Sequence, residues 1–159
     1  MSELQIPRFG ALLAPYIGQV PAEAMPRFLA LLERGAADRY RHWAGLLPAH
    51  ADELLQCAAS EDEIADRVDA VFALRAGDVE ALHAPLPAAK QAYVAVFEGL
   101  DLWDQLRIQA DAERQGAQAW RTIAARATDA GVVAELAACS ALEEASADRL
   151  DRLVAAHAG

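Results

Sequence analysis

Several hallmarks of common protein classes are missing or scarce in this sequence of 159 residues. It has only two cysteines, which provide no disulfide framework and are expected to be reduced thiols. Its first residues lack the basic and apolar segments of a secretion signal, and no apolar run reaches the roughly 18 residues of a membrane span. A cytoplasmic protein that does not enter a membrane is therefore expected.

Basic residues are also scarce. Lysine and arginine together number 14 against 24 aspartates and glutamates, which gives a net charge of −10. A surface of this sign repels phosphate backbones and anionic membranes. The sequence therefore predicts no nucleic-acid partner.

Aromatic residues make up only 6% of the chain and glycine occurs nine times, whereas 55% of the residues are hydrophobic and many of those are alanine. This composition favours helices over strands. A chain of this length can bury one core, so a single all-α domain is expected over residues 1–159.

The chain contains an internal repeat. Segment 57–69 recurs as segment 139–151, with Cys, Ala, Glu, Ala, Asp, Arg and Asp at matching positions. A second pair of segments, 33–44 and 113–124, shares the pattern Glu-Arg-x-x-Ala-x-x-(Tyr/Trp)-Arg-x-x-Ala. Two copies spaced by about 80 residues are too few for a solenoid and favour two halves of one bundle.

The halves are expected at residues 1–77 and 78–159, each with one short and two long helices. Proline, glycine and turn residues predict long helices at about 26–47, 51–75, 101–127 and 131–157, short flanking helices at about 9–17 and 88–98, and a crossover at about 78–87. Gly77 is expected to cap the second long helix. The predicted fold is an antiparallel four-helix bundle from a duplicated helix hairpin, plus two short flanking helices.

Four repeated glutamates occupy apolar faces of the predicted long helices: Glu33, Glu61, Glu113 and Glu143. Residues three, four and seven positions away share a helix face, and around each glutamate these are mostly apolar or small. A buried, unpaired carboxylate costs several kcal/mol or takes up a proton. The cluster then requires a divalent metal pair, shared protons or buried arginine. If the faces are slightly rotated, the glutamates lie instead at the bundle edge in ordinary arginine pairs.

One carboxylate from each of four helices is the ligand pattern of ferritin-like di-iron bundles. The chain resembles the ferritin-like superfamily of the bacterioferritin, rubrerythrin and di-iron hydroxylase type. In that superfamily the first helix of each pair carries a Glu followed seven residues later by an aromatic residue. Glu33 with Tyr40 and Glu113 with Trp120 match this element, and the two aromatic side chains are expected to fill core space.

The motif of the second helix is incomplete, because the family has Glu-x-x-His where Glu61 is followed by Ile64 and Glu143 by Ser146. The resemblance implies one or two divalent metal ions, iron, manganese or another, held by the four glutamates with Glu61 and Glu143 as bridging ligands. It also implies a metal-dependent oxidoreductase with O₂ or peroxide as oxidant. An all-carboxylate ligand set favours harder ions such as Mn²⁺, Mg²⁺ or Ca²⁺ over an imidazole-supported iron pair.

A second interpretation stays open at this stage. Loss of both histidines suits a degenerate ferritin-like bundle without a cofactor, which serves as a structural or interaction module. The sequence decides neither whether the protein is an enzyme nor which small molecule is its substrate.

Cys57 and Cys139 each stand one turn before a repeated glutamate on the same face. They are expected to be small buried thiols. As an alternative, a Cys-x-x-x-Glu pair supplies additional metal ligands, since thiolate binds iron or zinc.

Two further features predict contacts. Gly35 and Gly116 lie inside predicted helices, where glycine costs roughly 1 kcal/mol relative to alanine, and close helix approach is the expected compensation. Segments 9–17 and 93–97 carry more large apolar side chains than a cap on an alanine-rich bundle needs, so a homodimer is expected.

Overall fold

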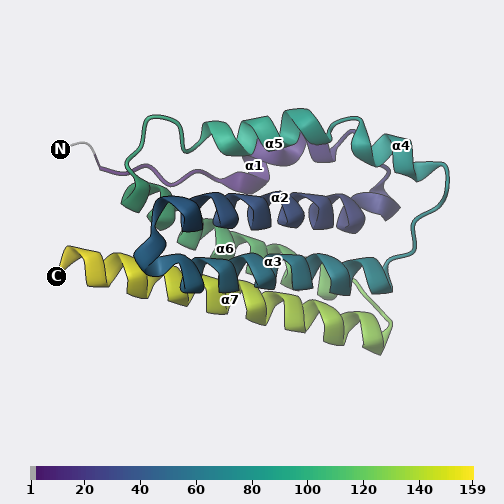
Figure 1. Ribbon diagram of the computed structural model, residues 1–159. Coiled ribbons are helices and arrows are strands. Elements are labelled where there is room, and N and C mark those ends of the chain that lie inside the picture. The colour runs from purple at the N-terminus through teal and green to yellow at the C-terminus, as the bar shows by residue number, and fades with distance from the viewer. Residues whose placement is uncertain (1–2) are drawn as a thin grey trace.

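A computed structural model describes residues 3–159, and every regular element in that range is helical, with no strand. This confirms the all-α class predicted from composition. Four long helices dominate the molecule (Figure 1): α2 (Met25–Leu46), α3 (Ala51–Val71), α6 (Leu102–Ala124) and α7 (Ala130–Ala158).

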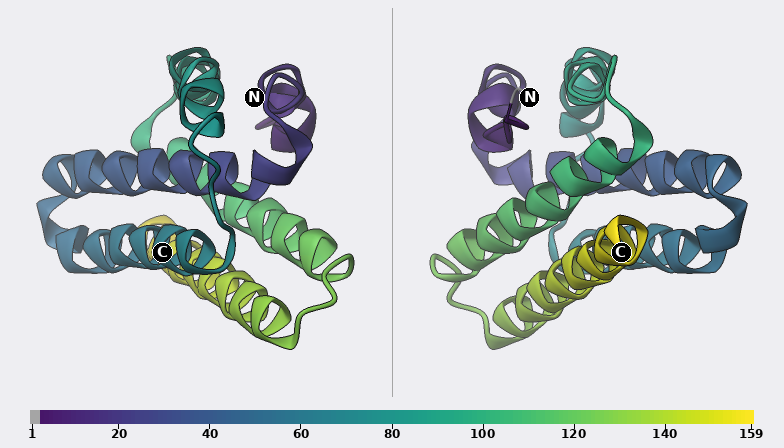
Figure 2. Two further views of the ribbon diagram at one scale, coloured as in Figure 1. Left: turned by 90° about the vertical axis from the view of Figure 1, so that its right-hand side faces the viewer. Right: turned by 90° about the vertical axis from the view of Figure 1, so that its left-hand side faces the viewer.

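The long helices form two hairpins. Helix α2 packs along α3, α6 packs along α7, and the hairpins meet through α3 and α7. They cross at an angle, and α2 and α6 are not among the closely packed helix pairs (Figure 2). The space above the α3–α7 contact is therefore bordered by α2 on one side and α6 on the other.

Two short helices cover this side of the hairpins. Helix α1 (Phe9–Ile17) packs against α5 (Leu86–Ala95), and these contact α6 and α2, respectively (Figure 2). They match the two predicted flanking helices. The predicted crossover also contains a short helix, α4 (Asp78–His83), and Gly77 precedes this helix instead of capping α3.

Helix α3 ends at Val71, earlier than predicted, because a side chain from α2 caps it. The Arg27 guanidinium donates to the carbonyl oxygens of Phe72, at 2.9 Å, and Asp69, at 3.3 Å, and pairs with the Asp69 carboxylate at 2.9 Å. A cation that binds the last carbonyls of a helix stabilises its end. The long-range contact sets this boundary, so the local sequence does not reveal it.

Other helix ends agree closely with local signals. The Asp101 carboxylate accepts hydrogen bonds from the backbone N–H groups of Trp103 and Asp104, both at 2.9 Å, at the start of α6. Asp129 accepts from Val132 N–H at 3.0 Å at the start of α7. Both are N-caps, which satisfy backbone donors that have no partner inside the helix.

The apolar core is divided along the helix axes. One cluster surrounds Trp43, Leu54 and Phe97, and another surrounds Ile64 and Trp120. On each long helix the repeated glutamate lies between residues of the first cluster and residues of the second. The four glutamates thus form a polar layer, called here the glutamate layer, that separates two apolar regions.

The large apolar side chains of the flanking helices have partners within the chain. Phe9 is buried in the core with Tyr93, and Phe97 just beyond α5 is buried against Trp43. These side chains require no second subunit, and the homodimer stays a prediction for light scattering to test. No helix within residues 3–159 is long and apolar enough to cross a bilayer.

Two adjacent leucines on α3 test this packing. Leu54 is 0% exposed in the core, whereas Leu55 is 46% exposed. Leu54→Ala should lower the free energy of unfolding by about 2–5 kcal/mol through lost burial and a residual cavity. Leu55→Ala should change it by no more than about 0.5 kcal/mol. Urea unfolding measures both, and equal losses would contradict the assigned faces.

Candidate metal centre: the glutamate layer

The four repeated glutamates come from four different long helices. Glu61 is fully buried, Glu113 and Glu143 are 2% exposed, and Glu33 is half-buried because it lines a cavity. None of the ion pairs found within residues 3–159 involves these four side chains. The alternative of arginine pairs at the bundle edge is therefore wrong.

Three of the glutamates meet closely. Glu33, Glu61 and Glu143 each offer a carboxylate oxygen, and these oxygens lie within 4.8 Å of one another. Such a group can hold a metal ion, because carboxylate oxygens at this spacing can converge on one cation.

Glu113 lies beside the three and is held in place by two hydrogen bonds. Its Oε1 accepts from the Tyr40 hydroxyl at 2.5 Å and from Gln109 Nε2 at 2.7 Å. The Tyr93 hydroxyl of α5 in turn donates to Gln109 Oε1. The other oxygen, Glu113 Oε2, is buried without a hydrogen-bond partner. One oxygen thus anchors the side chain and the other is left for a ligand.

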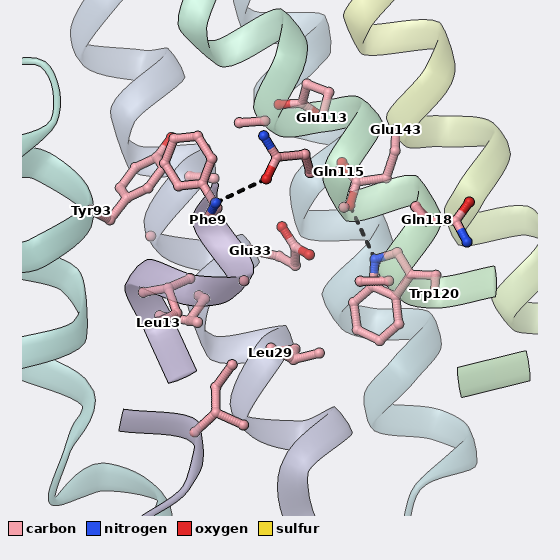
Figure 3. Close-up of a pocket in the computed structure, with 18 of the residues that line it drawn as sticks. Phe9, Leu13, Leu29, Glu33, Tyr93, Glu113, Gln115, Gln118, Trp120 and Glu143 are labelled. Atoms are coloured by element: carbon pink, nitrogen blue, oxygen red, sulfur yellow. Dashed lines mark hydrogen bonds between the residues drawn. The ribbon is translucent and has the colours of Figure 1, made fainter. Parts of the chain in front are cut away.

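The Glu143 carboxylate accepts one hydrogen bond and occupies a space that a glycine leaves free. Trp120 Nε1 donates to Glu143 Oε1 at 3.0 Å (Figure 3). A β-carbon placed on Gly116 would lie 2.5 Å from the same oxygen and 2.9 Å from Glu143 Cδ. Glycine is therefore required at position 116 for a carboxylate to fit, where the sequence had predicted close approach of another helix.

Glu61 is the least compensated side chain of the layer. Both of its carboxylate oxygens are buried and lack any hydrogen-bond partner. A carboxylate in this state pays a desolvation cost of several kcal/mol with no return from hydrogen bonding. Its environment requires a cation or a proton.

The electrostatics of the layer point the same way. Burial raises the pKa of Glu33 from 4.5 to about 7, with repulsion from Glu113 adding to the effect. Burial also raises the pKa of Glu61 and of Glu143 well above the ordinary range, again with repulsion from neighbouring glutamates. Without a cation, the layer holds protons at neutral pH.

The two cysteines are buried, as predicted, but they do not join the group of three glutamates. Cys139 Sγ lies 3.9 Å from the carbonyl oxygen of Ile64. Burial raises the pKa of each thiol to about 12, so both are neutral at physiological pH. A bound metal would deprotonate a coordinating thiol, so cysteine ligation stays a prediction.

The positions of the missing histidines are filled by packing. Ile64 is fully buried in the second apolar cluster, and Ser146 is buried on α7. Both positions face the interior, as a ligand would, but neither supplies nitrogen. The donor set of the layer consists of carboxylate oxygen.

Sequence reasoning missed two supporting residues. Gln109 stands four residues before Glu113 on the same face of α6, so helical spacing could have identified it. Tyr93 comes from α5, outside the repeated segments, and only the fold brings it to Gln109. Tyr40 and Trp120 do fill the core as predicted, and each also donates a hydrogen bond to a glutamate.

A cavity of about 700 Å³, lined mainly by residues of α1, α2, α5 and α6, reaches the layer. Glu33, Glu113 and Glu143 contribute to its wall, and most of the remaining wall is apolar (Figure 3). Volumes of 300–1,000 Å³ are typical of small-molecule sites. These three glutamates are thus accessible to a small molecule from the cavity.

Comparison with protein-family models, with curated proteins and with solved structures found no match. The ferritin-like resemblance therefore depends on the sequence pattern of glutamates and aromatic residues.

The metal-free protein should lose stability as pH rises. The folded-state pKa of Glu33 is about 7, above the ordinary 4.5, so stability from its proton is complete below pH 4.5 and is lost as pH rises through about 7. Thermal unfolding of metal-stripped protein should show Tm falling between about pH 5 and 8. Glu33→Gln, which cannot ionise, should flatten this slope. An equal slope in both proteins would contradict the assignment.

Gly116 and Gly45 provide a matched pair of substitutions. Gly116→Ala should displace the Glu143 carboxylate and destabilise the fold by about 1–3 kcal/mol, as overpacking does. At Gly45 on α2, a β-carbon meets nothing within 4 Å, so Gly45→Ala should stabilise the fold by about 0.4–1 kcal/mol. Urea unfolding measures both. A neutral Gly116→Ala would show that Glu143 needs no such space.

Proposed function

We propose that this protein is a ferritin-like metalloprotein that binds one or two divalent metal ions in the glutamate layer. The observation that carries the proposal is Glu61, with two buried carboxylate oxygens that have no hydrogen-bond partner. A third orphaned oxygen, Glu113 Oε2, lies in the same layer. A bound cation would satisfy these three carboxylate oxygens, which have no hydrogen-bond partner in the protein.

Both the number and the chemistry of these residues suit a metal site. Glu33, Glu61 and Glu143 would hold the first ion, and Glu113 would contribute its free oxygen to this ion or to a second one. Oxygen-only ligands suit hard ions, among which Mn²⁺ is redox-active. When bound, such an ion supplies redox chemistry with O₂ or peroxide, and the protein would then be a metal-dependent oxidoreductase.

The surrounding side chains have separate roles in this proposal. Tyr40 and Gln109 hold Glu113 in one orientation, and Trp120 does the same for Glu143. Donors of this kind fix metal ligands and tune their basicity. The apolar wall of the cavity limits water near the layer and strengthens electrostatic interactions there.

A non-catalytic bundle is the second candidate, and the apolar and hydroxyl side chains at Ile64 and Ser146 favour it. In this case the glutamates keep their protons, as their raised pKa values allow, and the molecule serves as a structural or interaction module. The two candidates differ in their response to metal.

Metal titration of two variants on α3 separates them. Purified protein loaded with Mn²⁺ should retain metal near stoichiometric amounts, and at a metal concentration of 100 Kd its Tm should exceed that of the stripped protein by about 5–10 °C. Glu61→Gln should abolish the uptake. It should also stabilise the stripped protein, because the amide carries no charge to desolvate. Elemental analysis and thermal unfolding measure these effects.

Glu63→Gln is the control, since Glu63 is an exposed residue of the same helix whose one ion pair within residues 3–159 is with Arg67. It should bind metal like the natural protein and lose at most about 1 kcal/mol of stability. Absence of metal uptake by the natural protein, tested with both Mn²⁺ and anaerobic Fe²⁺, would favour the non-catalytic bundle.

A further inference from the structure

The cavity beside the glutamate layer is elongated. Its wall on α2 runs from Met25 to Asp38, fourteen residues of helix, so its length is about 20 Å at 1.5 Å per residue. Its wall on α6 runs from Gln109 to Ile123, which gives about the same length. A molecule with an extended shape fits such a space better than a compact one.

The two ends of the cavity differ in polarity. From Glu33 toward the start of α2, the cavity residues of α2 are the apolar Leu32, Leu29 and Met25, and Ile123 of α6 belongs to the same apolar cluster as Leu29. The other end contains Tyr93 and Gln109. The apolar end extends about 12 Å from the glutamate layer, which suits a hydrocarbon chain.

A single cation lies in the cavity wall at the level of the glutamate layer. Lys90 of α5 is the only lysine of the chain, and it is half-buried. Its aliphatic stem crosses α2 where Gly35 has no side chain, since a β-carbon there would lie 3.3 Å from Lys90 Cε. Gly35 thus provides the space for this stem, whereas the sequence predicted a close helix approach.

The Lys90 ammonium has no ion-pair partner among residues 3–159. Asp38, the acidic residue of the wall that lies outside the layer, is paired with Arg41 at 3.0 Å. In a chain with a net charge of −10, a lysine without an ion-pair partner among residues 3–159 is unusual. It provides a site for an anion that enters the cavity.

We propose that the cavity binds a medium-chain aliphatic carboxylate, with the carboxylate at Lys90 and the chain along Leu32, Leu29 and Met25. This inference rests on the proposed metal binding, because every glutamate that is ionised in the metal-free layer would repel an anionic head group. With two divalent ions bound, their charge balances that of the four carboxylates, and the Lys90 charge dominates the head-group site. The first carbons of the chain then lie beside the metal-loaded layer.

Binding of three ten-carbon probes to Mn²⁺-loaded protein tests the head group. Calorimetry should show one decanoate bound per chain, with decanol and decylamine at least about tenfold weaker because neither offers the lysine ammonium a negatively charged partner. Lys90→Met should weaken decanoate binding at least about tenfold, and Lys90→Arg should restore it to within about threefold. Preferential binding of decylamine, or equal binding by Lys90→Met, would overturn the proposal.

A second measurement uses the natural lysine. Reductive methylation with ¹³C-formaldehyde labels the amino terminus and Lys90, so Lys90 gives one resolvable side-chain resonance. Decanoate should shift this resonance and decanol should not. An unshifted resonance under saturating decanoate would overturn the assignment of the head-group site.

The chain-binding end is tested by filling it. Leu29→Trp should weaken decanoate at least about tenfold and leave hexanoate within about threefold, since only the longer chain reaches that end. Leu46→Trp is the control on the same helix, because Leu46 is exposed and outside the cavity. Equal loss of both acids in Leu29→Trp would overturn the proposed orientation.

Mn²⁺ binding without any probe, followed by electron paramagnetic resonance, separates the two proposals. If Mn²⁺ binds and decanoate does not, the inference fails and the metal site stands. If neither Mn²⁺ nor anaerobic Fe²⁺ binds, both fail.

Discussion

Four carboxylates in one layer of an apolar core are the constraint on which the rest of this structure depends. Their desolvation opposes folding, and their mutual repulsion adds to it, as the raised pKa of Glu33, about 7, illustrates. The two apolar clusters on either side must supply enough burial to offset this cost. Fully buried aromatic side chains, among them Trp43 and Trp120, supply much of that burial.

The arrangement of the long helices follows from the same constraint. Close packing of α3 against α7 brings Glu61 and Glu143 together, while the separation of α2 and α6 leaves room for a cavity that reaches Glu33. Helices α1 and α5 then cover that side and bring Tyr93 to the hydrogen-bond chain that ends at Glu113. The fold thus places a charged layer inside an apolar core and keeps it accessible to small molecules.

Much of this could be predicted from the sequence, because periodicity and repetition are local signals. The apolar stripes identified all four glutamates as inward-facing, and Asp101 and Asp129 marked the helix starts. What could not be predicted depends on contacts between distant segments. Arg27 ends α3 early, Tyr93 reaches the layer from α5, and Gly35 and Gly116 make space for side chains of other helices. None of these contacts produces a periodic pattern in the sequence.

The repeated halves support the glutamates unequally, although their sequences match. Tyr40 donates across to Glu113 on the other hairpin, whereas its counterpart Trp120 donates to Glu143 within its own hairpin. Glu61 receives no donor at all. A lineage that stopped using the site would therefore lose its glutamates in a definite order. Glu61 would be lost first, because its replacement removes a desolvation cost. Glu113 would be lost last, because its loss would leave the Tyr40 and Gln109 donors without an acceptor.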